Sequence, residues 1–191
     1  MDIQGKNTRL RPARIEDRRK IFEWLTQSDV TPSIMGSPEY PDHPVPSWEE
    51  FKNDYTSSFF QDNTNATGKN YIILVGETEV GTIGYDNLDF HKGMVDLDIW
   101  MRAEAFCGHG YGSEAINTLT DHLHHTHGVY EFRVDPSSRN TRAIKAYRRS
   151  GFIEERRVNP DESADYYDTI VMVKRIAHRT MPSSRRREHR G

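Results

Sequence analysis

Residues 94–119 read Met-Val-Asp-Leu-Asp-Ile-Trp-Met-Arg-Ala-Glu-Ala-Phe-Cys-Gly-His-Gly-Tyr-Gly-Ser-Glu-Ala-Ile-Asn-Thr-Leu, and this stretch decides the fold. The apolar pattern over 94–101 predicts a strand. Three glycines within 107–113 predict a tight turn, after which apolar residues recur at helical spacing: Ala115, Ile116, Leu119 and Leu123. A strand that leads through a glycine turn into a helix offers backbone N–H groups and the positive end of the helix dipole to an anion. We therefore expect this turn to hold a phosphate-bearing cofactor.

The spacing of the glycines excludes two common phosphate loops. Gly108-x-Gly110-x-Gly112 is not the dinucleotide pattern G-x-G-x-x-G, and it lacks the Gly-Lys-Ser/Thr ending of an NTPase loop. Taken alone, such a turn is equally compatible with a flexible connection. A second motif further along the chain adds to it: Asn140-x-x-Ala143-x-x-x-Tyr147-x-x-x-Gly151-Phe152.

In this order, the two motifs resemble the signatures of the GCN5-related N-acetyltransferase (GNAT) superfamily, which uses acetyl-CoA. The resemblance covers about residues 8–175. The family's pyrophosphate loop is usually Arg/Gln-x-x-Gly-x-Gly/Ala, and it maps here to residues 107–112, so Cys107 stands where Arg or Gln is usual. That departure removes one side-chain contact and leaves the backbone cradle in place.

The resemblance implies an α/β fold with a single mixed central β-sheet that is splayed in the middle and flanked by about four helices. The residue pattern itself predicts the order β-α-α-β-β-β-α-β-α-β-β, which fits one α/β domain. We expect strands at 8–13, 70–75, 80–85, 93–102, 129–135, 152–157 and 166–174. We expect helices at 15–26, 48–60, after the glycine turn and at 140–150, and a proline-rich loop at 28–47.

The resemblance also implies how acetyl-CoA binds. In the family the strands that match 94–101 and 129–135 diverge, and the pantetheine arm pairs with the first, so the backbone of Ile99, Trp100 and Met101 would carry it. The pyrophosphate would lie on the N–H groups at the turn: His109, Gly110, Tyr111, Gly112 and Ser113. Asn140 and Ala143 would lie beside the cofactor, although Asn140 is also a good helix N-cap.

Two residues are candidates for acid–base chemistry. Tyr147 is the candidate general acid, because a phenol (pKa about 10) held near the departing CoA sulfur (thiol pKa about 8.5) can donate a proton. Asp98 is the candidate base, because a carboxylate in the cleft can take the proton of an ammonium or orient it. The alternatives are a core aromatic for Tyr147 and an outward-facing strand residue for Asp98.

The acceptor is predicted from a closer resemblance to aminoglycoside 6′-N-acetyltransferases. Asp98 aligns with their catalytic aspartate, and Asp135-Pro136-x-x-x-Asn140 matches a motif whose aspartate helps to hold the amino sugar. Asp165 and Asp168, with Asp161 and Glu162, are candidates for an acidic rim of the cleft, or else lie in a solvated hairpin. The predicted substrate is a small cationic amine of the aminoglycoside type.

Three alternatives stay open. The enzyme could be a general small-amine acetyltransferase or a protein N-terminal or lysine acetyltransferase, since Ser33, Ile34 and Met35 stand where tryptophans are common in the aminoglycoside enzymes. A non-catalytic CoA-binding module is the third alternative, and the presence of Tyr147 argues against it. The sequence leaves open whether the protein is a monomer or a homodimer.

Bulk properties agree with a cytoplasmic enzyme. The 191 residues suit one domain, predicted over 1–176. No apolar run approaches the roughly 20 residues of a membrane span, and the first residues lack the apolar core of a signal peptide. The single cysteine excludes an intrachain disulfide and fits a reducing compartment.

Charge is unevenly distributed along the chain. The net charge is −3; residues 175–191 hold six arginines and one glutamate, a net +5, which leaves −8 for the rest. An acidic body favours a cationic substrate, and ordinary solubility is the alternative. We expect residues 177–191 to be a disordered basic tail, and no fold motif supports nucleic-acid binding. His122, His124, His125 and His127 lack the partners of a tetrahedral metal site, so no metal is predicted.

Overall fold

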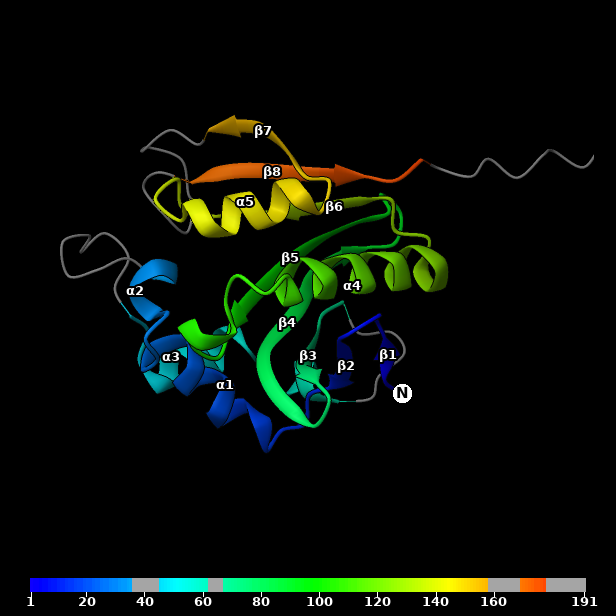
Figure 1. The fold of residues 1–191 in the computed structure, drawn as a ribbon. Coiled ribbons are helices and arrows are strands. Elements are labelled where there is room, and N and C mark those ends of the chain that lie inside the picture. Colours follow the sequence, from blue (N-terminus) through cyan, green and yellow to red (C-terminus); the bar gives the residue numbers. More distant parts are fainter. Residues whose placement is uncertain (36–44, 62–66, 158–168, 178–191) are drawn as a thin grey trace, which may run out of the picture.

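An eight-stranded sheet forms the centre of the protein. The computed structural model describes residues 1–35, 45–61, 67–157 and 169–177. The strand order is β1-β2-β3-β4-β5-β6-β8-β7 (Figure 1). The bounds are β1 Ile3–Gln4, β2 Arg9–Pro12, β3 Lys69–Val75, β4 Thr78–Asp89, β5 Met94–Met101, β6 Glu131–Val134, β7 Ile153–Arg157 and β8 Ile170–Arg175. The pairing of β5 with β6 is parallel and the others are antiparallel, which confirms the predicted mixed sheet.

Helices cover both faces of the sheet. They are α1 Asp17–Thr26, α2 Thr31–Ile34, α3 Trp48–Asp54, α4 Tyr111–His127 and α5 Thr141–Arg149, with short 3₁₀ segments η1 Ser57–Phe60 and η2 Glu104–Phe106. Apolar side chains of α4 and α5 pack with β3–β6 and β8 in one core cluster. Those of α1 and α3 pack on the opposite face in a second cluster. The strand β5 therefore contributes side chains to both cores.

The sheet opens beside the second half of β5. The strands β5 and β6 pair only through three residues of β5, in the register Met94↔Glu131, Val95↔Phe132 and Asp96↔Arg133. From Leu97 to Met101 the strand stays paired with β4 alone. Figure 1 shows the two halves of the sheet diverging beyond the paired end. The predicted splay is thus present, and it leaves one edge of β5 open to a ligand.

Strand alternation explains why β5 can serve both cores. Successive side chains of a strand point to opposite faces. Ile99 and Met101 pack against the cluster that contains α4, whereas Trp100 belongs to the cluster that contains α1 and α3. Both clusters are composed largely of aliphatic and aromatic residues with little exposed surface, as expected for the two sides of a buried strand.

The predicted helix at 48–60 is wrong in its second half. α3 begins at the Ser47 N-cap, where Ser47 and Glu50 form a reciprocal capping box, and it ends at Asp54. Tyr55 leaves helical geometry (φ −96°, ψ 72°), and a 3₁₀ turn follows at Ser57–Phe60. Thr56 and two serines follow the break, and such residues favour turns and caps over helix interiors. The i, i+4 aromatic spacing suggested a longer helix than these residues support.

Other boundaries also shift. The loop predicted at 28–47 contains the short helix α2, where Pro32 stands in the first turn. The strand β1 was not predicted; it pairs Ile3 with Leu10. The strand β8 is described from Ile170; residues 166–168 of the strand predicted from Tyr166 lie outside the described part, as do 178–191 of the predicted tail.

Candidate active site

The glycine turn is held in a conformation that other residues avoid. Gly108 and Gly110 have φ of +80° and +85°, in the left-handed region, and Gly110 is the N-cap of α4. A Cβ built on either glycine meets no atom within 4 Å. Space for a ligand therefore lies directly above the backbone of the turn, at the positive end of the α4 dipole.

The first turn of α4 is anchored to the amino-terminal strands. The Glu114 carboxylate accepts hydrogen bonds from the backbone N–H groups of Asn7 (2.6 Å) and Thr8 (2.8 Å), and from both of their side chains. Burial alone would raise the pKa of Glu114, but these donors outweigh it and lower the pKa to about 2. The carboxylate is thus kept ionised and engaged with Asn7 and Thr8.

A cavity of about 190 Å³ extends from the glycine turn along the open edge of β5 to α5. It is walled by α2, β5, η2 and the facing surfaces of α4 and α5. Ten of the predicted site residues line it: Ile99, Trp100, Met101, Gly110, Tyr111, Gly112, Ser113, Asn140, Ala143 and Tyr147. Residues from two distant motifs and one strand therefore meet at one site.

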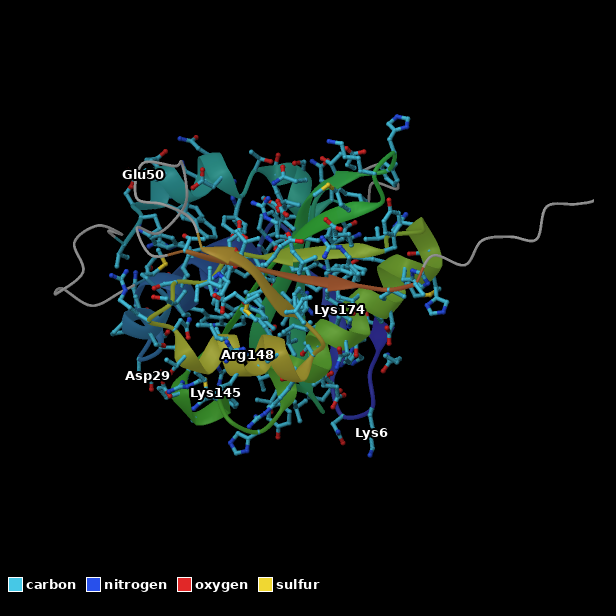
Figure 2. All side chains as sticks on the ribbon, turned by 90° about the horizontal axis from the view of Figure 1, so that it is seen from above. Lys6, Asp29, Glu50, Lys145, Arg148 and Lys174 are labelled. Atoms are coloured by element: carbon cyan, nitrogen blue, oxygen red, sulfur yellow. The ribbon has the colours of Figure 1, made fainter. Side chains whose placement is uncertain are left out.

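Three basic side chains of α5 also line this cavity, and the sequence analysis missed them. Arg142, Lys145 and Arg149 recur at i, i+3 and i+7, so they share one face of the helix. Arg142 pairs with Glu104 of η2 at 2.6 Å. Lys145 and Arg148 project from α5 on the same side of the molecule (Figure 2). The helical spacing was the signal that could have identified these cations.

The chemistry of this cavity fits acetyl-CoA. The left-handed glycines leave room at a helix amino terminus, where phosphate groups bind well. Lys145 and Arg149 add positive charge on the facing helix. The open edge of β5 provides backbone hydrogen-bonding groups for an extended amide-containing arm.

Tyr147 lies inside the cavity on a rigid helix. α5 starts at the Asn140 N-cap, whose side-chain oxygen accepts the Ala143 N–H at 3.1 Å. Tyr147 follows one turn after Ala143; it is only 7% exposed and its ring centroid lies 5.7 Å from that of Phe152. Asn140 caps the helix, as one interpretation predicted, and it also lines the cavity. Tyr147 likewise packs in the core while lining the cavity.

Asp98 lies outside the cavity lining but next to it on β5. The side chain is exposed, and its Oδ2 accepts a hydrogen bond from the Tyr55 hydroxyl. Trp100, two residues along the strand, lies among the residues that line the cavity. Alternation places Asp98 and Trp100 on one face of β5. Tyr55 was not singled out by sequence, because its predicted helix would have continued past it.

The remaining predicted residues are placed as follows. His109 lies at the exposed tip of the turn, where its ring stacks on Tyr111 (centroids 5.5 Å apart). Asp135 follows β6 and pairs with Arg133 at 2.6 Å, and it does not line the cavity. Asp165 and Asp168 lie outside the described residues.

Cys107 occupies the first position of the loop signature. The side chain is half-buried and lines the cavity. Burial raises the pKa of the Cys107 thiol, although the nearby Arg142 opposes that shift. Cys107 is therefore a neutral group in a place where the family usually has a cationic or amide side chain.

The described residues contain neither a metal-binding cluster nor a membrane-spanning helix. No group of three or more His, Cys, Asp or Glu side chains in them is arranged to hold a metal ion. Two of the histidines of α4 contact backbone carbonyls instead: His124 Nδ1 lies 2.8 Å from the Val129 oxygen and His125 Nδ1 lies 2.6 Å from the Asp121 oxygen. No helix within the described ranges is long and apolar enough to cross a membrane.

Residues 7–153 match the acetyltransferase (GNAT) domain family. The chain belongs to this family. The GNAT match spans most of the 191 residues and confirms the predicted family and its fold. The GNAT chain is accordingly an acyl-CoA-dependent N-acetyltransferase, and acetyl-CoA is its co-substrate. No curated protein matches it.

Solved GNAT structures share the fold at low sequence identity. The aminoglycoside acetyltransferase AAC(6')-Ib in complex with ribostamycin and coenzyme A has a TM-score of 0.68 at 20% identity, covering 89% of this chain and 94% of that one. The ribosomal L7/L12 alpha-N-protein acetyltransferase RimL in complex with coenzyme A has a TM-score of 0.71 at 18% identity, covering 92% and 98%. Spermidine N-acetyltransferase from Vibrio cholerae, in complex with CoA and spermine, has a TM-score of 0.67 at 16% identity, covering 87% and 94%. These neighbours act on different amines, so their likeness supports the fold alone.

Proposed function

We propose that this enzyme transfers the acetyl group of acetyl-CoA to a primary amine of a small cationic acceptor, an amino sugar of the aminoglycoside type. The carrying observation is the cavity that joins the glycine turn to Tyr147 along the open edge of β5, with Asp98 on the same strand. A carboxylate beside the cavity, on the strand that lines it, suits a cationic amine. The AAC(6')-Ib neighbour binds ribostamycin, an acceptor of this kind.

Acetyl-CoA would be held by groups from three elements. Backbone N–H groups from His109 to Ser113 would bind the pyrophosphate, and the backbone from Ile99 to Met101 would pair with the pantetheine arm. Lys145 and Arg149 would neutralise phosphate charge. Asn140 and Ala143 would flank the cofactor at the start of α5.

The bound co-substrate supplies a thioester, an acyl carbon that an amine can attack. Asp98 would hold the ammonium form of the acceptor and take up its proton, directly or through water. Tyr147, enclosed in the cavity, would deliver a proton at the leaving-group end. The proton removed from nitrogen is thereby balanced by the proton given to sulfur.

Acidic residues beyond β5 would attract the acceptor. Asp135 would face the amino sugar, with its ion pair to Arg133 holding the carboxylate in place. Asp165 and Asp168 would extend the acidic rim. We also propose that residues 1–176 form the catalytic domain, that 177–191 is a basic tail, and that the enzyme works in the cytoplasm as a monomer or homodimer.

A second candidate function is acetylation of polyamines or of protein amino termini. The wall of α2 favours it, because Ser33 and Ile34 line the cavity where the aminoglycoside enzymes often carry tryptophans. The RimL and spermidine N-acetyltransferase neighbours act on such acceptors.

A thiol-release assay decides between these functions. Purified enzyme is given acetyl-CoA and, in turn, kanamycin-type aminoglycosides, polyamines, amino acids and short peptides. Aminoglycoside turnover with kcat/KM above about 10⁴ M⁻¹s⁻¹ supports the first proposal. Turnover confined to polyamines or peptides supports the second. Tight CoA binding without turnover of any amine refutes both.

A further inference from the structure

Tyr55 is placed by aromatic contacts with Phe51, Phe59 and Trp100 and by one hydrogen bond. It follows the last residue of α3, outside helical geometry. The ring stacks on Phe51 (centroids 4.5 Å, planes 14° apart) and meets Trp100 edge-on (centroids 5.8 Å, planes 87° apart). The hydroxyl donates to Asp98 Oδ2. The break in the helix therefore delivers a rigidly packed phenol to the candidate base.

Trp100 carries a buried donor without a partner. The side chain is 4% exposed, and within the described part of the chain its Nε1–H has no hydrogen-bond acceptor. Buried polar groups are nearly always paired, so such an atom calls for an explanation. Trp100 lines the cavity, on the strand face that also carries Asp98. A bound ligand with an oxygen atom would satisfy this donor.

We propose that Tyr55, Asp98 and Trp100 together form the acceptor subsite, and that it selects an amine with an oxygen atom on a neighbouring carbon. The Asp98 carboxylate binds the ammonium, and Tyr55 is a positioning residue that fixes that carboxylate. The Trp100 N–H donates to the adjacent oxygen of the acceptor. This inference rests on the proposed function and deepens it, because it favours amino sugars and amino alcohols over plain alkyl polyamines.

The geometry sets the size of such an acceptor group. Residues two apart on a strand are about 7 Å apart along the chain. A carboxylate and an indole N–H at that spacing on one face of β5 match a primary amine and an oxygen two or three bonds away.

Matched acceptors test the selection directly. We compare tetrahydropyranylmethylamine, whose ring oxygen lies beside the carbon that carries the aminomethyl group, with cyclohexylmethylamine, which lacks that oxygen. The wild-type enzyme is expected to prefer the oxygen-bearing amine about tenfold in kcat/KM, the size of one hydrogen bond. Calorimetric titration of each amine into the enzyme saturated with CoA gives a second, activity-independent measure.

Two variants test the separate roles of Tyr55 and Trp100. Tyr55→Phe keeps the ring contacts and removes the hydroxyl; it should raise KM for both amines about tenfold, leave KM for acetyl-CoA unchanged and leave Tm within about 2 °C. Tyr130→Phe, at the far, paired end of β5 and β6, is the control and should change neither KM. Trp100→Phe should abolish the preference, so that the two amines have about equal kcat/KM.

The outcomes separate this inference from the proposed function. Equal turnover and equal binding of the two amines by the wild type, or a Tyr55→Phe variant whose acceptor KM is unchanged, overturns the subsite while acetyl transfer stands. If Trp100→Phe fails to fold, the wild-type comparison still decides. No turnover of any amine overturns the proposed function and this inference with it.

Discussion

Gly110→Ala tests two features of the glycine turn: its left-handed backbone conformation and the space that it leaves for a ligand. With φ at +85°, an alanine at this position costs about 1–2 kcal/mol of backbone strain. Alanine also lowers the conformational entropy of the unfolded chain, which offsets about 0.4–1 kcal/mol of that strain. No protein atom lies within 4 Å of the new Cβ, so no clash adds to this. The net destabilisation is about 1 kcal/mol, or a Tm lower by about 2–4 °C.

The matched control is Gly76→Ala in the turn between β3 and β4. Gly76 also has positive φ (+57°) and open space around its Cβ, and it does not line the cavity. Its cost in stability should equal that of Gly110→Ala within about 0.5 kcal/mol, by thermal or urea unfolding. The two variants thus introduce similar backbone strain, and only Gly110→Ala places its methyl group in the cavity.

Their affinities for CoA should differ. At Gly110 the methyl group occupies space over the N–H groups of the turn, and losing one charge-assisted hydrogen bond costs about 1.5–3 kcal/mol. Calorimetric titration with CoA should therefore give a Kd at least tenfold weaker for Gly110→Ala and unchanged for Gly76→Ala. Equal affinities in the two variants would refute the placement of the pyrophosphate on this turn.

Three further predictions concern α4 and α5. Tyr147→Phe should lower kcat about 100-fold while leaving Kd for CoA within twofold, measured by thiol release and calorimetry. Gly112→Ala should stabilise α4 by about 0.5–1 kcal/mol, since its Cβ meets Met101 and Ile99 at ordinary contact distances of 3.7 and 3.8 Å, yet weaken CoA binding about tenfold. Glu114→Gln should cost about 1–2 kcal/mol at pH 7. Because the pKa of Glu114 is lowered from 4.5 to about 2 in the folded state, its contribution is present above pH 4.5 and lost toward pH 2, so the Tm difference from wild type should vanish there.

The sheet and its main helices followed from the sequence because their signals are local. The alternation of β5 and the glycine turn before α4 are short-range patterns with one physical solution. The splay came from the resemblance to the family, since the pairing of β5 with β6 joins segments that no local pattern connects. The boundary errors fall where two sequence signals disagree. At Tyr55 the aromatic spacing predicts a longer helix, whereas the threonine and serines that follow favour its end.

The cofactor side of the site was more predictable than the acceptor side. Backbone cradles require glycines at fixed spacing, so Gly110 and Gly112 are visible in the sequence itself. Arg142, Lys145 and Arg149 could have been found from their helical spacing. The contact between Tyr55 and Asp98 joins residues 43 positions apart and depends on a break in a helix, so no sequence pattern marks it.

The alternation of β5 gives a physical reason for this difference. Ile99 and Met101 face the core that holds α4, while Asp98 and Trp100 face the side of α1 and α3. In the proposed site, one strand would serve the cofactor through its edge and one face, and the acceptor through its other face. Changes on the proposed acceptor face would alter the amine without disturbing the glycine turn. We therefore expect the identity of the amine to depend on Tyr55, Asp98 and Trp100, whereas the motifs that reveal the family serve the cofactor.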